Sequence, residues 1–295
     1  MITAQDVKAL REKTGAGMMD CKKALTECDG DMAAAIDWLR EKGIAKAAKK
    51  SDRVAAEGLT RVAVDNNVAL IFEVNSETDF VAQNDLFIEL LNKIEKALIE
   101  NRPTTLEDAF EVQVDGKTIK EIETEATASI GEKITLRRFE IITKNDDEVF
   151  GSYMHMGGKI SAVSVIKGGK EDVAKDVAMQ VASMNPKYAV RADIPAEDVE
   201  HERKVQTEIM ANDTSLAGKP ENVLKNILEG KISKNFKDLC LADQEFFKDP
   251  NLKVSQYVKN ANCEIVKFVR FATGEGIEKK EDNFIEEVMS QAFGK

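Results

Sequence analysis

The chain reads VALIFEVNSETDFVA over residues 68–82, and this stretch joins a strand to a helix. Its first five residues are apolar and predict a buried strand. Residues 84–98 then carry apolar side chains at helical spacing: Phe87, Leu90, Leu91, Ile94 and Leu98. Asp79 and Phe80 therefore lie at a corner between a strand and a helix, where side chains can project from a rigid frame.

The residues alone allow two interpretations of this corner. In the first, Thr78 or Asp79 caps the following helix and Phe80 packs beneath it. In the second, Asp79 and Phe80 point outward and contact another molecule. The pattern by itself favours the first interpretation.

Two blocks of the sequence resemble one known family. Residues 73–82, EVNSETDFVA, resemble the signature of the elongation factor Ts family. Residues 10–25, LREKTGAGMMDCKKAL, resemble that family's N-terminal signature, and both blocks occur in the family's order. One departure is Gln83, where the family usually carries Lys, Arg or Asn, and it alters the charge at this position only.

The composition indicates a protein with substantial cores and a polar surface. Of its 295 residues, 43% are hydrophobic and 32% are charged, and the net charge is −11. Nucleic-acid binding needs a basic footprint, so we expect no DNA partner. The first residues lack the regions of a signal peptide, no apolar run approaches a membrane span, and the four cysteines form no Cys-x-x-Cys pair. We therefore expect a cytoplasmic protein without membrane contact.

No catalytic, metal or cofactor site is evident in the sequence. Gly15-Ala16-Gly17 starts like a dinucleotide-binding loop, but the third glycine is missing and the segment follows a helix. Gly168-Gly169-Lys170 lacks the other glycine and the Ser/Thr of a phosphate loop. The histidines, His155 and His201, show no zinc-binding spacing. We predict a protein that is not an enzyme and binds no cofactor, metal or nucleotide of its own.

Residues 1–54 predict an N-terminal module of three short helices followed by a basic linker. Thr3 and Asp31 can cap the first and third helices, and Gly43 is placed to close the third. The linker, residues 44–54, carries among its alanines the cations Lys46, Lys49, Lys50 and Arg53. It is interpreted either as a solvated helical connector, which we favour, or as a tether that also touches an acidic partner.

The rest of the chain shows a weak internal repeat, and the fold class is α+β. Core subdomain 1, residues 55–144, predicts strands near 59–65, 68–75 and 134–139 with helices near 84–100 and 117–130. Core subdomain 2, residues 145–272, predicts strands near 149–155, 160–166 and 266–271 with a helix at 171–184. The two subdomains are thus related units of sheet and helix.

Two further helical segments are predicted. An antiparallel helical hairpin of coiled-coil type is inserted at about residues 188–234, where the second half of the repeat is longer than the first. Its narrow apolar stripes and high charge favour projection into solvent over packing on the sheet. Residues 273–295 predict a C-terminal module, a glycine hinge and a short amphipathic helix that either closes its own core or docks on a partner.

The family resemblance implies a specific activity. Family members carry a ubiquitin-associated-like module at the N-terminus and a helical protrusion at the position of the hairpin. Their partner is the GTPase elongation factor Tu, from which they promote GDP release by disturbing its magnesium and phosphate site. The family's phenylalanine wedges between helices of that partner. The residues that this implies for partner binding are Thr78, Asp79, Phe80, Val81, Met18, Met19, Lys22, Lys50, Ile130, Gly131 and His155.

The sequence leaves alternatives open for the role of His155 and for the function of the chain. A lone histidine such as His155 is more often structural or merely exposed, although the family's Gly-Ser-Tyr-x-His block places its histidine at the partner interface. The chain could instead be a non-catalytic adaptor that uses its ubiquitin-associated-like module. A ribosome-binding or RNA-binding factor is a further alternative, which the acidic charge disfavours.

Overall fold

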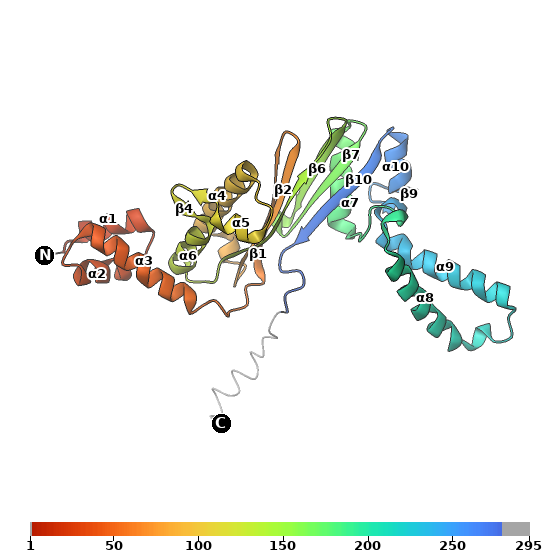
Figure 1. The fold of residues 1–295 in the computed structure, drawn as a ribbon, viewed down its shortest axis with the longest axis horizontal. Helices are drawn as coiled ribbons and strands as arrows, with labels where there is room; N and C mark the ends of the chain where they lie inside the picture. Colours follow the sequence, from red (N-terminus) through yellow and green to blue (C-terminus); the bar gives the residue numbers. More distant parts are fainter. Residues whose placement is uncertain (1, 279–295) are drawn as a thin grey trace, which may run out of the picture. The chain divides into compact units, whose positions relative to one another are not determined.

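A computed structural model describes residues 2–278 and has the α+β fold (Figure 1). The chain divides into two compact units. Unit 1 comprises Met1–Thr60, Phe72–Glu140 and Ala272–Lys295, and unit 2 comprises Arg61–Ile71 and Ile141–Phe271. The helix predicted within the C-terminal module lies outside the described residues. None of the described helices is both long and apolar enough to cross a membrane.

Unit 1 begins with the three predicted helices, α1 (Ala4–Thr14), α2 (Met18–Glu27) and α3 (Met32–Ala48). The predicted caps are confirmed. Thr3 and Asp6 form a capping box, and Asp31 Oδ1 accepts from the amides of Ala33 and Ala34 at 2.8 and 3.0 Å. The three helices enclose a small core of Val7, Leu10, Cys21, Ala24, Leu25 and Ala35.

The prediction that Gly43 closes the third helix is wrong, because α3 continues through this glycine to Ala48. The reason lies in packing rather than in capping. A Cβ atom at Gly43 would lie 3.2 Å from Ala128 Cβ on α6 (Ile119–Ile130). The missing side chain therefore lets α3 and α6 approach closely, although a glycine inside a helix costs about 1 kcal/mol relative to alanine.

Strands and helices of the predicted pattern follow. A three-stranded sheet has the order β1-β2-β5, and its strands contribute residues to both units. The elements of this part are β1 (Glu57–Asp65), β2 (Val68–Ser76), the 3-10 turn η1 (Val81–Gln83), α4 (Asp85–Asn101), α5 (Leu106–Glu111), β3 (Gln113–Val114), β4 (Lys117–Thr118), α6 and β5 (Thr135–Thr143).

A buried carboxylate joins α6 to β5. Glu123 accepts a hydrogen bond from Leu136 N, and four residues later Thr127 Oγ1 accepts from Ile134 N at 3.1 Å. Burial raises the pKa of Glu123 from 4.5 to about 7, although the hydrogen bond from Leu136 and the charge of Lys120 partly oppose this shift.

Unit 2 contains the second sheet, with the order β10-β7-β6. Strands β6 and β7 are antiparallel, with a register that runs from Glu148 opposite Lys167 to His155 opposite Ile160. The elements are β6 (Glu148–His155), η2 (Met156–Gly158), β7 (Ile160–Lys167), α7 (Glu171–Met184), η3 (Arg191–Asp193), α8 (Ala196–Ala211), η4 (Thr214–Leu216), α9 (Glu221–Leu239), η5 (Leu241–Asp243), β8 (Glu245–Phe246), β9 (Asp249–Lys253), α10 (Val254–Asn260) and β10 (Glu264–Ala272).

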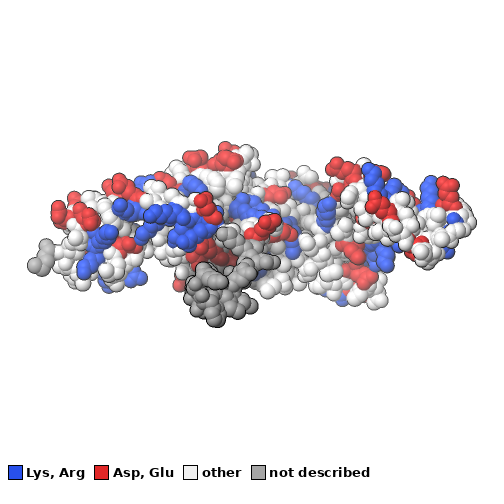
Figure 2. Space-filling view, turned by 90° about the horizontal axis from the view of Figure 1, so that it is seen from below, with Lys and Arg blue, Asp and Glu red and all other residues white. Residues whose placement is uncertain are grey.

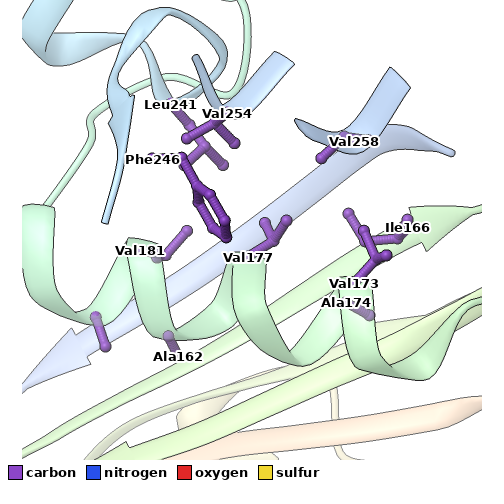
Figure 3. Packing of buried hydrophobic residues seen from close by; sticks show 11 residues of the cluster. Ala162, Ile166, Val173, Ala174, Val177, Val181, Leu241, Phe246, Val254 and Val258 are labelled. Carbon is purple, nitrogen blue, oxygen red and sulfur yellow. The ribbon is translucent and has the colours of Figure 1, made fainter. Parts of the chain in front are cut away.

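Helix α7 lies between the strands and the segment that carries β8 and α10, as Figure 3 shows. Its valines pack on one side against Ala162 and Ile166 and on the other against Phe246 and Val258. Gly151 permits this closeness, because a Cβ atom there would overlap the carbonyl oxygen of Ala174. Unit 2 therefore has a core of its own, centred on one helix.

The predicted hairpin is formed by α8 and α9, which run side by side (Figure 1). Helix α8 contains no buried residue, and α9 buries only Ile232 and Phe236, near its C-terminal end. These two side chains form a cluster at the base of the hairpin with Tyr188 and Cys240. The disfavoured alternative was that both helices pack on the sheet. The absence of buried residues in α8 excludes it for that helix.

Candidate functional site

The corner after β2 presents a large aromatic side chain to solvent. Phe80 is 84% exposed, more than any other large hydrophobic side chain among residues 2–278. The cap of α4 is Asn84, whose Oδ1 accepts from Leu86 N at 2.9 Å. The interpretation in which Thr78 or Asp79 caps the helix over a buried Phe80 is thus wrong. Asp79 is exposed beside Phe80.

The backbone on both sides of Phe80 is held in place. Thr78 makes three hydrogen bonds: its amide and its hydroxyl donate to Glu132, and its carbonyl accepts from Ser76 Oγ at 2.9 Å. After Phe80, the side chains of Val81 and Ala82 are buried, and Asn84 N donates to Val81 O at 2.9 Å. The phenyl ring therefore extends into water from a chain that is fixed before and after it.

The loop that follows α6 belongs to the same cluster. Gly131 ends α6 in the left-handed conformation, with φ 92°, and Ile130 immediately before it is half-buried. Lys50 Nζ donates a hydrogen bond to Gly131 O. Hydrogen bonds thus bring three distant parts of the predicted site together: Lys50 bonds Gly131, which follows Ile130, and Thr78 bonds the next residue, Glu132.

The predicted basic linker, residues 44–54, begins within the last turns of α3 and is anchored at several points. Lys46 Nζ lies 2.8 Å from Asp20 Oδ2, and Arg53 Nη1 lies 3.1 Å from Glu77 Oε2. Lys133 Nζ donates to the carbonyl oxygens of Ser51 and Arg53 at 2.6 and 3.0 Å. Figure 2 shows lysine and arginine side chains gathered over this region. The segment is therefore held against the rest of unit 1, and it still presents positive charge to solvent.

The predicted residues of the N-terminal module share a face of α2. Met18 and Met19 are 53% and 74% exposed, and Lys22 is also exposed. Residues three and four positions apart on a helix are neighbours, so Lys22 lies next to both methionines. Cys21, Ala24 and Leu25 occupy the opposite, buried side. The module therefore offers two apolar side chains and a cation to a partner.

His155 lies in unit 2. It ends β6, is partly exposed, and its Nδ1 lies 3.4 Å from Tyr153 Oη. The side chains on either side, Met154 and Met156, are exposed. Met156 has a positive φ of 51°, a conformation that is uncommon for a residue other than glycine. The histidine thus belongs to an exposed, partly apolar turn.

Among residues 2–278, no group of three or more His, Cys, Asp or Glu side chains is placed to hold a metal ion. The polar groups gathered at the corner instead bond one another, with Glu77 and Glu132 as the central acceptors.

Sequence reasoning missed these two glutamates. Glu77 lies inside the signature block, but nothing in its position shows that it accepts from Lys133 N at 2.6 Å. Glu132 follows the end of a predicted helix, where a charged residue carries no signal. Both contacts link residues more than 50 positions apart, and a single sequence does not reveal such pairs.

A protein-family model described as Elongation factor TS matches residues 77–275, which is more than half of the chain. The matched range includes the Thr78–Val81 corner, Ile130, Gly131 and His155, whereas Met18, Met19, Lys22 and Lys50 precede it.

Proposed function

Since the chain belongs to the elongation factor Ts family, whose role is nucleotide exchange in translation elongation, we propose that it binds the GTPase elongation factor Tu and releases its GDP. The protein acts by binding rather than by catalysing a covalent reaction. It disturbs the magnesium and phosphate site of the GTPase, after which GTP rebinds. We place this activity in the cytoplasm, where translation occurs.

The observation that carries the proposal is the exposed phenyl ring of Phe80 on a fixed backbone. Exposure of a large apolar side chain to water is unfavourable for the free protein. Burial of that side chain by a partner therefore stabilises the complex. Aromatic side chains of this kind commonly dominate protein interfaces. Asp79 adds a negative charge next to the ring. This carboxylate can repel the phosphate of the nucleotide or compete for the partner's phosphate-binding groups.

An exchange factor acts by binding one form of its partner, so it needs no catalytic group and no nucleotide site of its own. A GTPase holds GDP through magnesium and a cradle of backbone amides. A protein that prefers the open form of this cradle weakens nucleotide binding, and the nucleotide weakens binding of that protein by the same factor. A shift from almost fully closed to almost fully open takes about 5 kcal/mol of differential binding, more than one side chain provides.

A broad contact can supply the remaining free energy. We propose further contacts from Met18, Met19 and Lys22 on the ubiquitin-associated-like module, from Lys50, Ile130 and Gly131 beside the wedge, and from His155 in unit 2. In this proposal, residues 1–54 form the docking module, 55–144 and 145–272 the related core subdomains, about 188–234 the binding arm, and 273–295 the C-terminal module. An interface of standard size needs such a spread of contacts.

The test is release of fluorescently labelled GDP from purified elongation factor Tu, followed by stopped flow with excess unlabelled nucleotide. Addition of the full chain is expected to accelerate release in a saturable manner, and excess free magnesium is expected to oppose it. Release at the intrinsic rate at all concentrations of a correctly folded chain would exclude this function. Binding without acceleration would instead support an adaptor.

A further inference from the structure

Glu132 holds the residue that precedes the Asp79–Phe80 pair. Its Oε2 accepts from Thr78 N at 2.9 Å and its Oε1 accepts from Thr78 Oγ1 at 2.6 Å. Both oxygens of one carboxylate are therefore committed to a single residue. Hydrogen bonds to an ionised acceptor are stronger than those between neutral groups, and a contact through both oxygens also fixes orientation.

A second carboxylate makes the reverse connection. Glu77 Oε1 accepts from Lys133 N at 2.6 Å, so two successive residues of the corner are bonded to two successive residues of the loop. Glu77 also contacts Arg53, and Lys133 contacts the carbonyl of Arg53. The corner, the loop after α6 and the segment after α3 thus form one hydrogen-bonded frame. None of the bonds in this frame involves the Phe80 side chain.

We propose that Glu132 is a positioning residue for nucleotide exchange, which fixes the direction of the Asp79–Phe80 pair before the partner arrives. The inference rests on the proposed function. An exposed phenylalanine at the end of a loose corner would sample many orientations, and ordering it on binding would cost conformational entropy. A frame that sets Thr78 in advance removes this cost and aims the ring at one place on the partner. Small misplacements of a group that acts by position can cost large factors in rate.

The first experiment measures the corner in the free protein. In Glu132→Ala, amide hydrogen exchange within residues 77–83 should become about tenfold faster, because Thr78 N loses its acceptor. Glu132→Gln should stay near the wild type, since the amide oxygen accepts from Thr78 N and its NH2 can donate to the rotated hydroxyl. Glu100→Ala, which removes an exposed charge elsewhere in unit 1, is the matched control. Unchanged exchange in Glu132→Ala would overturn the proposal.

The second experiment measures GDP release at saturating concentrations of each variant. Glu132→Ala should lower the maximal rate about tenfold, whereas Glu132→Gln and Glu100→Ala should change it less than twofold. A role through Phe80 also predicts non-additivity, so in a Phe80→Ala background the Glu132→Ala change should add less than twofold. If Glu132→Ala lowers the maximal rate equally in the wild-type and Phe80→Ala backgrounds, its role is merely structural. If Glu132→Ala leaves the maximal rate unaltered, the positioning role is contradicted.

A second variant replaces Glu132→Ala if that protein melts below the assay temperature. Glu132→Asp keeps the charge but is one methylene shorter, and we expect it to show the same faster hydrogen exchange and the same lower maximal rate. Hydrogen exchange needs no partner, so it tests the frame even if the wild-type chain fails to release GDP. That failure would reject the proposed function, whereas a normal wild-type rate with an insensitive Glu132 would reject only the positioning role.

Discussion

The buried carboxylate of Glu73 accepts a hydrogen bond from Arg138 Nε at 2.6 Å and so joins β2 to β5. The same group accepts from Arg137 Nη1 at 3.1 Å, from Asn75 Nδ2 at 2.9 Å and from Gly274 N at 2.7 Å. Arg137 Nη2 and Arg138 Nη2 in turn donate to the carbonyls of Glu275 and Ala272. One buried charge therefore organises the strand that leads to the corner and the segment that follows β10.

Glu73→Gln should destabilise unit 1, because it leaves two partly buried guanidinium groups without their central carboxylate. Breaking a buried ion pair on one side typically costs about 3–5 kcal/mol. We expect a loss of this order in the free energy of unfolding, measured by urea titration. The control is Glu12→Gln, where an exposed pair with Lys8 at 3.7 Å should contribute less than about 0.5 kcal/mol. Equal stability of the two variants would contradict the central role of Glu73.

Substitution of the exposed pair should separate activity from stability. Phe80→Ala and Asp79→Ala should each lower the maximal rate of GDP release, the former by about tenfold or more, as expected for an interface anchor. Both side chains are exposed, so the unfolding free energy should change by less than about 0.5 kcal/mol. Stopped-flow release and thermal melting would be measured together, with Met184→Ala as the control for loss of an exposed apolar side chain in unit 2. Loss of exchange only through unfolding would refute the wedge.

Glu123 should make the free energy of unfolding decrease as the pH rises. Its pKa in the folded protein is about 7, against 4.5 for the unfolded group, because burial disfavours the carboxylate. The folded state therefore binds the proton more tightly, and the stabilisation is complete below pH 4.5 and is lost as the pH rises through about 7. The loss corresponds to about 3 kcal/mol.

Glu123→Gln keeps a neutral acceptor for Leu136 N at every pH. It should therefore exceed the wild type in stability at pH 8 by up to about 3 kcal/mol and approach it at pH 4.5. Chemical denaturation at both pH values, with the exposed Glu111→Gln as the control, measures the difference. A difference that does not vary with pH would mean that the carboxylate is already charged in the fold.

Local patterns predicted the regular elements well. The apolar run at 68–72 and the helical spacing at 84–98 gave β2 and α4, because β2 is buried along its whole length and α4 buries one face. The two short strands between α5 and α6 were missed. Asp115-Gly116 is a hairpin signal, and both residues have positive φ, yet the strands that it joins, β3 and β4, have two residues each. Strands this short carry no readable alternation.

Features that depend on distant residues could not be predicted. Gly43 looked like a helix end, and only the approach of Ala128 explains its place inside α3. The sequence pattern favoured a buried Phe80, whereas Asn84 provides the cap and leaves the ring exposed. The family resemblance, not the periodicity, indicated the outward direction. Glu132 and Lys133 complete the corner from the far end of α6, which no local pattern reveals.

The hairpin can be shortened without damage to unit 2 only if its base is kept. Tyr188 and Ile232 are buried in the cluster at the base, and Arg191 donates to Ser233 Oγ at 3.0 Å and to Asp243. Excision of the whole predicted range, about 188–234, would remove these contacts. Residues 200–227 instead contain no buried side chain, and the flanking Val199 and Leu228 pack on the same cluster.

Replacement of residues 200–227 by a short Gly/Ser loop should therefore preserve the melting transition of unit 2. Loop-closure entropy depends only weakly on length, so the new connection itself matters little. We expect partner affinity to fall, since contact area is lost, whereas the maximal rate of GDP release should be recovered at high concentration of the shortened protein. The pair that we assign to the wedge, Asp79 and Phe80, remains untouched by this change.

Titration of the release rate against the concentration of the shortened protein separates partner affinity from the maximal rate of GDP release. A maximal rate that collapses while affinity is retained would show that the hairpin helps to open the nucleotide site, and its assignment as a binding arm would then be wrong.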